Sequence, residues 1–274
     1  MIGRRHAIEV DGRTLVAHDG GGDGPVAVWH HGSPQTGALL APVVEAARAR
    51  GLRVVSYARP SYGGSSPRPG RAVASAAADV AAVADALGIE RYAVVGASGG
   101  GPHALACAAL TPERVTAVAS LAGIAPRDAA IDWYAGMVAP DGLRAAEAGR
   151  DARARFVETE EFDEASFVDA DWAALAGEWR ALGADAGAAG AAGPDGLVDD
   201  DVEFVSPWGF ALDAVRAPAL VVRGGRDRVV PATHGDWLAA ALPQAELWAR
   251  PDDGHVSVLT ALPDVLSWLA ARSG

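Results

Sequence analysis

The chain has 274 residues, half of them hydrophobic, and a formal net charge of −12. This length suits one large α/β domain with room for an insertion, and the apolar fraction favours a globular fold over a disordered chain. The acidic charge argues against nucleic-acid partners and against docking on anionic lipid, because both interactions need a basic face.

Every positive side chain is an arginine, and the sequence contains no lysine. The absence of lysine excludes a lysine Schiff base and the phosphate-binding P-loop, whose lysine must reach the phosphates. The single cysteine, Cys107, cannot form a disulfide within the chain. No stretch approaches the ~20 apolar residues of a membrane span, and the first residues lack the apolar region of a secretory signal. We therefore expect a cytoplasmic protein.

The first part of the chain alternates between strand and helix patterns. Two short strand patterns, 7–10 and 14–19, are joined by the hairpin signal Asp11-Gly12. Further strand patterns lie at 26–32, 52–60, 92–98 and 115–126, and helical patterns separate them at 36–51, 72–88 and 99–112. Because the strands are nearly all apolar and alternate with helices, we expect a parallel sheet covered on both faces.

The alternation stops after residue 125 and resumes near residue 213. The range between them is acidic, helix-prone and rich in aromatic residues, and its low-complexity stretch 183–196 is predicted to be mobile. Strand patterns return at 217–225 and 245–252, with helical patterns at 231–242 and 257–272. The sequence thus predicts a mostly parallel, doubly wound α/β sheet of about eight strands, a core formed by 1–125 and 213–274, and a helical cap insertion at 126–212.

A G-x-S-x-G motif, residues 96–100, lies where a strand pattern ends and a helix pattern begins. Such a turn exposes the serine hydroxyl in a strained conformation, and its small flanking residues let the backbones of strand and helix pass closely. A dinucleotide-binding loop would need glycine at the position of Ser98. We therefore interpret Ser98 as a nucleophile.

A serine nucleophile needs a base and an acid that orients the base. Asp227 and His255 each follow a strand pattern, so both are expected to meet Ser98 at the carboxyl edge of the sheet. Asp252 and Asp253 are closer to His255 in the sequence and stay open as alternatives for the acid.

Backbone N–H groups near Ser98 can stabilise an oxyanion. We expect one from Gly99, directly after the nucleophile, and one from Ser33, in the loop after strand pattern 26–32; Pro34 has no N–H to offer. The adjacent His30 and His31 point to opposite faces of a strand and have no ligand cluster around them, so they do not indicate a metal site.

Taken together, the motifs resemble the α/β-hydrolase superfamily in its cap-containing form. They run in the family's order: HGSP (31–34), ARPSYGGSS (58–66), GASGG (96–100), GGRDRVVP (224–231) and DGHVS (253–257). The resemblance implies Ser98 as nucleophile, His255 as base and Asp227 as acid, with Ser33 and Gly99 as oxyanion donors. A serine at position 98 disfavours epoxide hydrolases and haloalkane dehalogenases, which attack with an aspartate.

The remaining candidates have more ordinary interpretations. Arg59 and Tyr62 are expected to shape a turn near the site, and His103 and Cys107 to pack on the helix after Ser98. An insertion above the sheet forms the roof of a pocket. We therefore expect substrate contacts from several cap aromatics: Trp133, Tyr134, Trp208 and Phe210.

We expect a cofactor-independent serine hydrolase, without a metal, that cleaves a small-molecule carboxylic ester or lactone through an acyl-enzyme. The same triad would serve an aminopeptidase, a carbon–carbon bond hydrolase or a perhydrolase. An aminopeptidase would need acidic cap residues to bind the amine, and Glu158, Glu160 and Glu161 are available. A non-catalytic small-molecule receptor is disfavoured because all three triad residues are present. The sequence does not indicate the oligomeric state.

Overall fold

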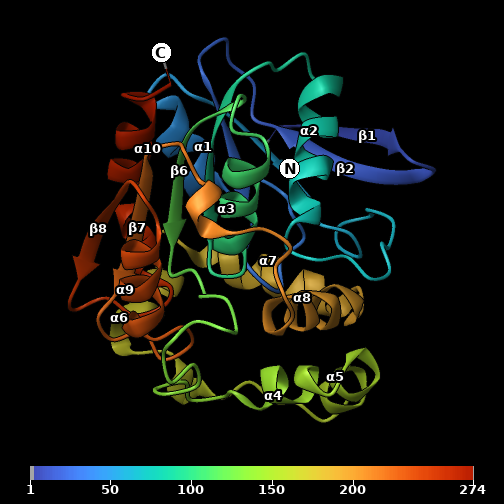
Figure 1. The fold of residues 1–274 in the computed structure, drawn as a ribbon, viewed down its shortest axis with the longest axis vertical. Coiled ribbons are helices and arrows are strands. Elements are labelled where there is room, and N and C mark those ends of the chain that lie inside the picture. The colour runs from blue at the N-terminus through green and yellow to red at the C-terminus, as the bar shows by residue number, and fades with distance from the viewer. Residues whose placement is uncertain (1–2, 274) are drawn as a thin grey trace.

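Valine- and alanine-rich runs form the central strands of an eight-stranded sheet in the computed structural model, which describes residues 3–273 (Figure 1). The strands lie in the order β1-β2-β4-β3-β5-β6-β7-β8. Their bounds are β1 (Arg4–Val10), β2 (Arg13–Asp19), β3 (Val26–His30), β4 (Arg53–Tyr57), β5 (Tyr92–Ala97), β6 (Val115–Leu121), β7 (Ala219–Gly224) and β8 (Ala245–Arg250). The pairs β1–β2 and β2–β4 are antiparallel and all others are parallel, which confirms the predicted sheet.

The antiparallel edge begins with the predicted hairpin. Asp11 and Gly12 connect β1 to β2 with φ angles of +51° and +74°. Positive φ at both central residues is the requirement of a type I′ turn, whose twist matches that of the flanking strands.

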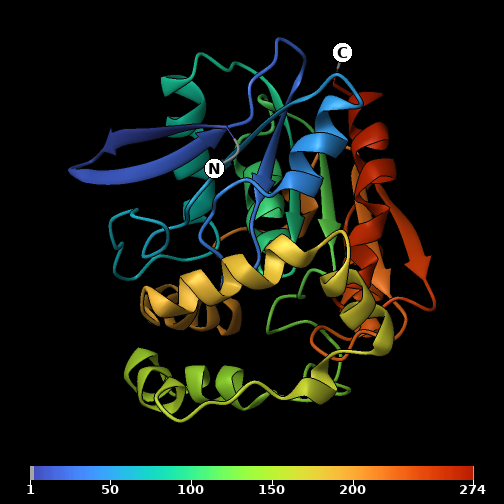
Figure 2. The ribbon, with the colours of Figure 1, turned by 180° about the vertical axis from the view of Figure 1, so that it is seen from behind.

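Alternate residues of the central strands pack on opposite faces of the sheet. Val26 and Val28 of β3 join the apolar cluster under α2 (Ser75–Ala86), α3 (Gly100–Leu110) and α9 (Ala232–Ala241). Ala27 and Trp29 join the cluster under α1 (Ala41–Arg48), the short 3₁₀ helix η3 (Ser257–Ala261) and α10 (Leu262–Ala270). Figure 2, seen from behind, shows α1 and α10 in front of the sheet. The sheet is therefore doubly wound.

Helix α1 begins later than the pattern 36–51 predicts. Gly37 has a φ of +82°, a conformation that no helix contains, and the helix starts at Ala41 with a proline in its first turn. The segment before α1 is consequently a loop. This loop lies beside the carboxyl ends of the strands and takes part in the site described below.

Five helices lie between β6 and β7, and we call them the cap helices. They are α4 (Asp141–Glu147), α5 (Arg150–Val157), α6 (Asp169–Ala176), α7 (Arg180–Ala191) and α8 (Asp195–Val205), with short 3₁₀ helices η1 (Glu164–Ser166) and η2 (Leu212–Ala214). In Figures 1 and 2 they lie beyond the end of the sheet toward which β6 and β8 point. The cap helices thus cover the carboxyl edge of the parallel strands.

The low-complexity stretch 183–196, expected to be mobile, is a helix for most of its length. Alanine has the highest helix propensity of any residue, which offsets the glycines spaced through α7. Asp185 of α7 also accepts the backbone N–H of Thr36 at 3.1 Å and the hydroxyl of the same residue. The stretch is therefore tied to the core. No helix within residues 3–273 has both the length and the apolar character that crossing a bilayer requires.

Candidate active site

Ser98 lies in the tight turn between β5 and α3. Its φ is +52°, a left-handed conformation that is uncommon for any residue but glycine. A Cβ atom built on Gly96 would lie 2.1 Å from the carbonyl oxygen of Gly100, and one built on Gly100 would lie 2.1 Å from that of His30. The close backbone approach that the sequence predicted therefore requires glycine on both sides of Ser98.

Ser98, His255 and Asp227 form one chain of hydrogen bonds. His255 Nε2 lies 2.9 Å from Ser98 Oγ, and His255 Nδ1 lies 2.8 Å from Asp227 Oδ2. Because an ionised carboxylate can only accept, Nδ1 carries the proton, and Nε2 can accept the proton of the serine hydroxyl. This is the donor and acceptor order that activates a serine nucleophile.

The Asp227 carboxylate is fixed in place from both sides. Its Oδ1 accepts two backbone N–H groups of the following turn, at 2.8 and 2.9 Å, and its side chain is 1% exposed. Of the alternative acids, Asp252 is exposed and Asp253 pairs with Arg250 at 2.6 Å. Among these three carboxylates, only Asp227 contacts the imidazole.

His255 is a stronger base than an unperturbed histidine. Burial lowers the pKa of His255, but the Asp227 carboxylate outweighs this effect, and Asp171 of α6 adds further negative charge. The resulting pKa lies above the ordinary value. A raised pKa favours proton transfer from the Ser98 hydroxyl.

The loop after β3 lies against the turn that carries Ser98. A Cβ built on Gly99 would lie 2.5 Å from Ser33 Oγ, and one built on Gly32 would lie 3.6 Å from the Cβ of Ser98. Within residues 3–273, the backbone N–H groups of Ser33 and Gly99 have no hydrogen-bond acceptor. Two unpaired N–H groups beside a nucleophile are suited to bind a developing oxyanion.

A buried ion pair connects this loop to cap helix α8. Arg59 is 1% exposed and donates to the carbonyl of His31 at 2.5 Å, to that of Gly32 at 3.1 Å, and to Ser33 Oγ at 2.9 Å. The same guanidinium pairs with Asp200 at 2.6 Å, and the hydroxyl of Ser33 donates to that carboxylate too. Arg59 therefore does more than shape a turn. It connects the loop that contains Ser33 to cap helix α8.

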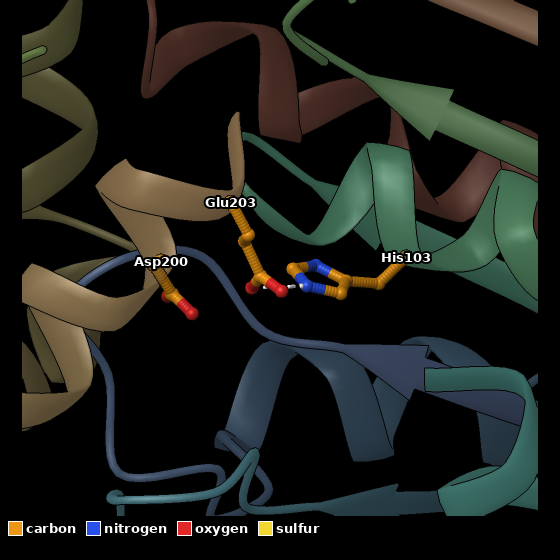
Figure 3. Close-up of side chains that lie close together, drawn as sticks. All are labelled: His103, Asp200 and Glu203. Carbon is orange, nitrogen blue, oxygen red and sulfur yellow. Dashed lines mark hydrogen bonds and ion pairs between the residues drawn. The ribbon is translucent and has the colours of Figure 1, made fainter. Parts of the chain in front are cut away.

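A second set of buried polar groups joins α8 to α3 (Figure 3). His103, Asp200 and Glu203 offer three possible metal-ligand atoms within 4.8 Å of one another, and His103 Nε2 lies 2.8 Å from Glu203 Oε1. Arg71 pairs with both carboxylates, and Arg59 with one of them. Burial raises the pKa of Asp200, but the two guanidinium groups hold that pKa well below its usual range. Guanidinium groups bind both oxygens of Asp200 and Oε1 of Glu203, whereas Glu203 Oε2 has no hydrogen-bond partner within residues 3–273. Because three of the four carboxylate oxygens are bound in this way, the set fits an ion-pair network better than a cation site.

The structure places the predicted substrate-binding aromatics inside the packing of core and cap: Trp133, Tyr134, Trp208 and Phe210. Trp133 and Trp208 are only 2% and 4% exposed. An aromatic ring that does lie against the turn carrying Ser98 is that of Phe204 on α8: its Cζ would lie 2.7 Å from a Cβ built on Gly99. Sequence reasoning missed Phe204, since no pattern separates it from the other cap aromatics. Substrate contacts of the predicted four stay a prediction.

The comparisons with known proteins agree with one another on the family of this chain. The family model for the alpha/beta hydrolase fold matches residues 25–262. The chain is 31% identical over 271 residues to the dihydrolipoyllysine-residue acetyltransferase component of the acetoin cleaving system of Cupriavidus necator, covering 97% of this chain and 68% of that protein. A 69-residue segment is 38% identical to the pimeloyl-[acyl-carrier protein] methyl ester esterase of Aromatoleum aromaticum and covers 25% of each protein. The enol-lactonase of Burkholderia xenovorans shares the fold, with a TM-score of 0.72 at 21% identity over 97% of this chain and 99% of that one.

Proposed function

Because the chain belongs to the alpha/beta hydrolase fold family and is a hydrolase of that fold, we propose that it cleaves a small-molecule carboxylic ester or lactone through an acyl-enzyme, without a cofactor. The observation that carries the proposal is the continuous chain Ser98–His255–Asp227, built on a left-handed turn that presents the serine at the carboxyl edge of the sheet. Esterase and lactonase names among the similar proteins support the choice of bond.

In the first half-reaction, His255 Nε2 takes the proton of Ser98 as Oγ attacks the carbonyl carbon. Asp227 keeps Nδ1 protonated and stabilises the imidazolium that forms. The N–H groups of Gly99 and Ser33 donate to the oxyanion, and the N-terminus of α3 adds the positive end of its dipole. The imidazolium then gives its proton to the leaving alcohol oxygen, and the acyl group stays on Ser98.

In the second half-reaction, His255 takes a proton from water as the water oxygen attacks the acyl carbon. The tetrahedral intermediate collapses, the carboxylic acid leaves, and Ser98 Oγ recovers its proton from the imidazolium. In a lactone the leaving alcohol and the acid stay in one molecule, so the product is a hydroxy acid. Neither half-reaction needs a metal or an organic cofactor.

The aminopeptidase alternative has the least support from side-chain positions. Glu158, Glu160 and Glu161 are exposed, and Glu160 pairs with Arg153 at 2.7 Å. An amine site would need an unpaired acid facing the nucleophile. The named relative in the acetoin cleaving system favours a different second candidate, in which the acyl group passes from Ser98 to an acceptor other than water. Carbon–carbon bond hydrolysis and perhydrolysis stay predictions.

Serine-directed chemistry tests the proposal. A fluorophosphonate should label the folded protein at Ser98, and p-nitrophenyl acetate turnover should fall to background in Ser98→Ala. Ser267→Ala, which changes an exposed serine that accepts a hydrogen bond from Arg50, is the matched control and should keep full turnover. Unlabelled Ser98 in folded protein, or turnover that survives in Ser98→Ala, would overturn the proposal.

The natural substrate can be narrowed with a substrate panel. We expect ester or lactone cleavage to exceed cleavage of anilides and peptides at equal concentration. Adding alcohol or thiol acceptors separates hydrolysis from acyl transfer, since a transferase would form the new ester at the expense of the free acid. The cytoplasmic location and the absence of nucleic-acid and membrane partners stay predictions.

A further inference from the structure

One carboxylate of the cap reaches the loop that carries His255. Asp171 of α6 is completely buried, and the two segments are 84 residues apart in sequence. We propose that Asp171 is a positioning residue for the reaction: it fixes the backbone around His255 and stabilises the imidazolium that forms when Ser98 loses its proton. The inference rests on the proposed serine hydrolase function and assigns it a second buried carboxylate besides Asp227.

The buried carboxylate of Asp171 accepts five hydrogen bonds. Its Oδ1 accepts the backbone N–H of Val256 at 2.8 Å and both the N–H and the hydroxyl of Ser257, at 2.7 and 2.8 Å. Its Oδ2 accepts the N–H of His255 at 3.2 Å and that of Val168, at the start of its own helix, at 3.0 Å. The carboxylate therefore fixes three consecutive residues of the His255 loop.

The Asp171 carboxylate of α6 lies very close to the backbone of the His255 loop at Gly254. A Cβ built on Gly254, the residue before His255, would lie 2.1 Å from Asp171 Oδ2. Glycine at position 254 is consequently what lets the cap carboxylate reach the backbone. A small movement of α6 would move the imidazole relative to Ser98.

The charge of Asp171 is balanced by dipoles only. None of the ion pairs among residues 3–273 includes Asp171, and its five donors are backbone N–H groups and one hydroxyl. A buried anion without a cationic partner is usually costly. A cation does form beside it in each half-reaction, on the imidazole of His255.

The charged and titratable groups that face His255 come from three elements. Asp227 follows β7, Asp171 lies on α6, and the Ser98 hydroxyl follows β5. In the loop of His255 itself, Asp253 is paired with Arg250. The pKa of His255 is lowered by burial and raised by Asp227 and then by Asp171. Removing the charge of Asp171 should therefore lower this pKa.

The test compares Asp171→Asn with Asp169→Asn. Asp169 lies in the first turn of the same helix and is exposed, so its substitution removes an equal charge without a contact to the His255 loop. For Asp171→Asn we expect kcat to fall about 10- to 100-fold with little change in KM, because the imidazole is displaced and less basic. The acid limb of kcat/KM should move to lower pH. Asp169→Asn should leave both unchanged.

A third variant predicts a shift of opposite sign. Ser257→Ala removes the hydroxyl that partly neutralises the Asp171 carboxylate, so the acid limb should move to higher pH. Because this change is milder, the acid limb of Ser257→Ala still tests the proposal if Asp171→Asn does not fold. A purely structural role would lower thermal stability in both variants and leave the acid limb where it is in the native protein.

A direct titration separates this inference from the proposed function. The His255 ring is followed by NMR in Ser98→Ala and in Ser98→Ala/Asp171→Asn, where no turnover is needed, and the second protein should titrate at lower pH. Equal His255 titrations, or an Asp171→Asn enzyme equal to Asp169→Asn in kcat and acid limb, would overturn the role of Asp171. Turnover that survives in Ser98→Ala would instead overturn the proposed function.

Discussion

Replacing Arg59 by methionine tests the buried ion pair behind the Ser33 loop. Arg59 is 1% and Asp200 0% exposed, and removing one partner of a buried pair costs about 3–5 kcal/mol in the free energy of unfolding. Arg71 still pairs with Asp200 at 2.5 Å, which favours the lower end, about 3 kcal/mol. At roughly 2–4 °C per kcal/mol for a chain of this size, Tm should fall by about 6–12 °C in differential scanning calorimetry.

The same substitution should reduce activity more than substrate affinity. In the proposed mechanism, the Ser33 N–H is an oxyanion donor that acts mainly in the transition state. Arg59 binds two carbonyls of the loop that contains Ser33, so a shift of this loop would weaken that donor. We expect kcat for p-nitrophenyl acetate to fall by about 100-fold, with KM changing by less. Arg59→Lys keeps the charge but loses the planar fork, so its kcat should lie between those of the native and methionine forms.

An exposed ion pair provides the control. Arg223 donates to Asp236 at 2.8 Å, but that carboxylate is 47% exposed, so Arg223→Met should cost less than about 1 kcal/mol and leave kcat unchanged. The reasoning is refuted if Arg59→Met melts within a degree of the native protein. It is equally refuted if the variant melts early yet keeps its kcat, because the ion pair would then stabilise the fold without supporting the loop.

Three further outcomes follow from the site. Gly99→Ala should lose most of its kcat and melt earlier, by calorimetry, since the new methyl group would lie 2.7 Å from Phe204 Cζ and something must shift. kcat/KM should rise with pH as His255 loses its proton, and the midpoint should lie above the ordinary histidine pKa. Asp227→Asn should move this limb to lower pH and cut kcat by about 10⁴-fold, which a pH series of initial rates checks. Cys107 is completely buried and burial raises the pKa of its thiol, so a thiol reagent should react only as fast as the chain unfolds, whereas rapid labelling of folded protein would contradict this packing.

The elements that sequence reasoning predicted well are those fixed by local chemistry. The β5–α3 turn could be recognised because a left-handed serine between close backbones leaves glycine as the only choice at positions 96 and 100. The hairpin at Asp11-Gly12 is similar, since Asp-Gly is a residue pair that tolerates the two positive φ angles of this turn. The sheet followed from apolar runs that alternate with helical ones. In each case the conformation is determined by a few residues that are neighbours in the sequence.

Contacts between distant segments could not be predicted in this way. Asp171 and Asp200 are two acids among many in an acidic insertion, and nothing nearby in the sequence distinguishes a carboxylate that will be buried on a core loop from one that faces water. The low-complexity stretch was misjudged for a related reason, because its order depends on Asp185 reaching Thr36 in a loop 149 residues away. The aromatic prediction was limited in the same way: nothing in the sequence indicates that Phe204 lies against Gly99, and substrate contacts of the four chosen residues stay a prediction.

The three cap carboxylates bear on how the insertion is related to the catalytic residues. Asp171 on α6 binds the His255 loop, Asp185 on α7 binds the loop before α1, and Asp200 on α8 binds Arg59 behind the Ser33 loop. Each comes from a different cap helix, and each contacts a different loop of the core. An insertion that only roofed a pocket would need apolar surface there and no buried charges. In the mechanism proposed above, these contacts make the cap part of the scaffold that positions the base and the oxyanion donors. We therefore expect that an exchange of cap segments that alters substrate preference must retain all three contacts to retain the proposed chemistry.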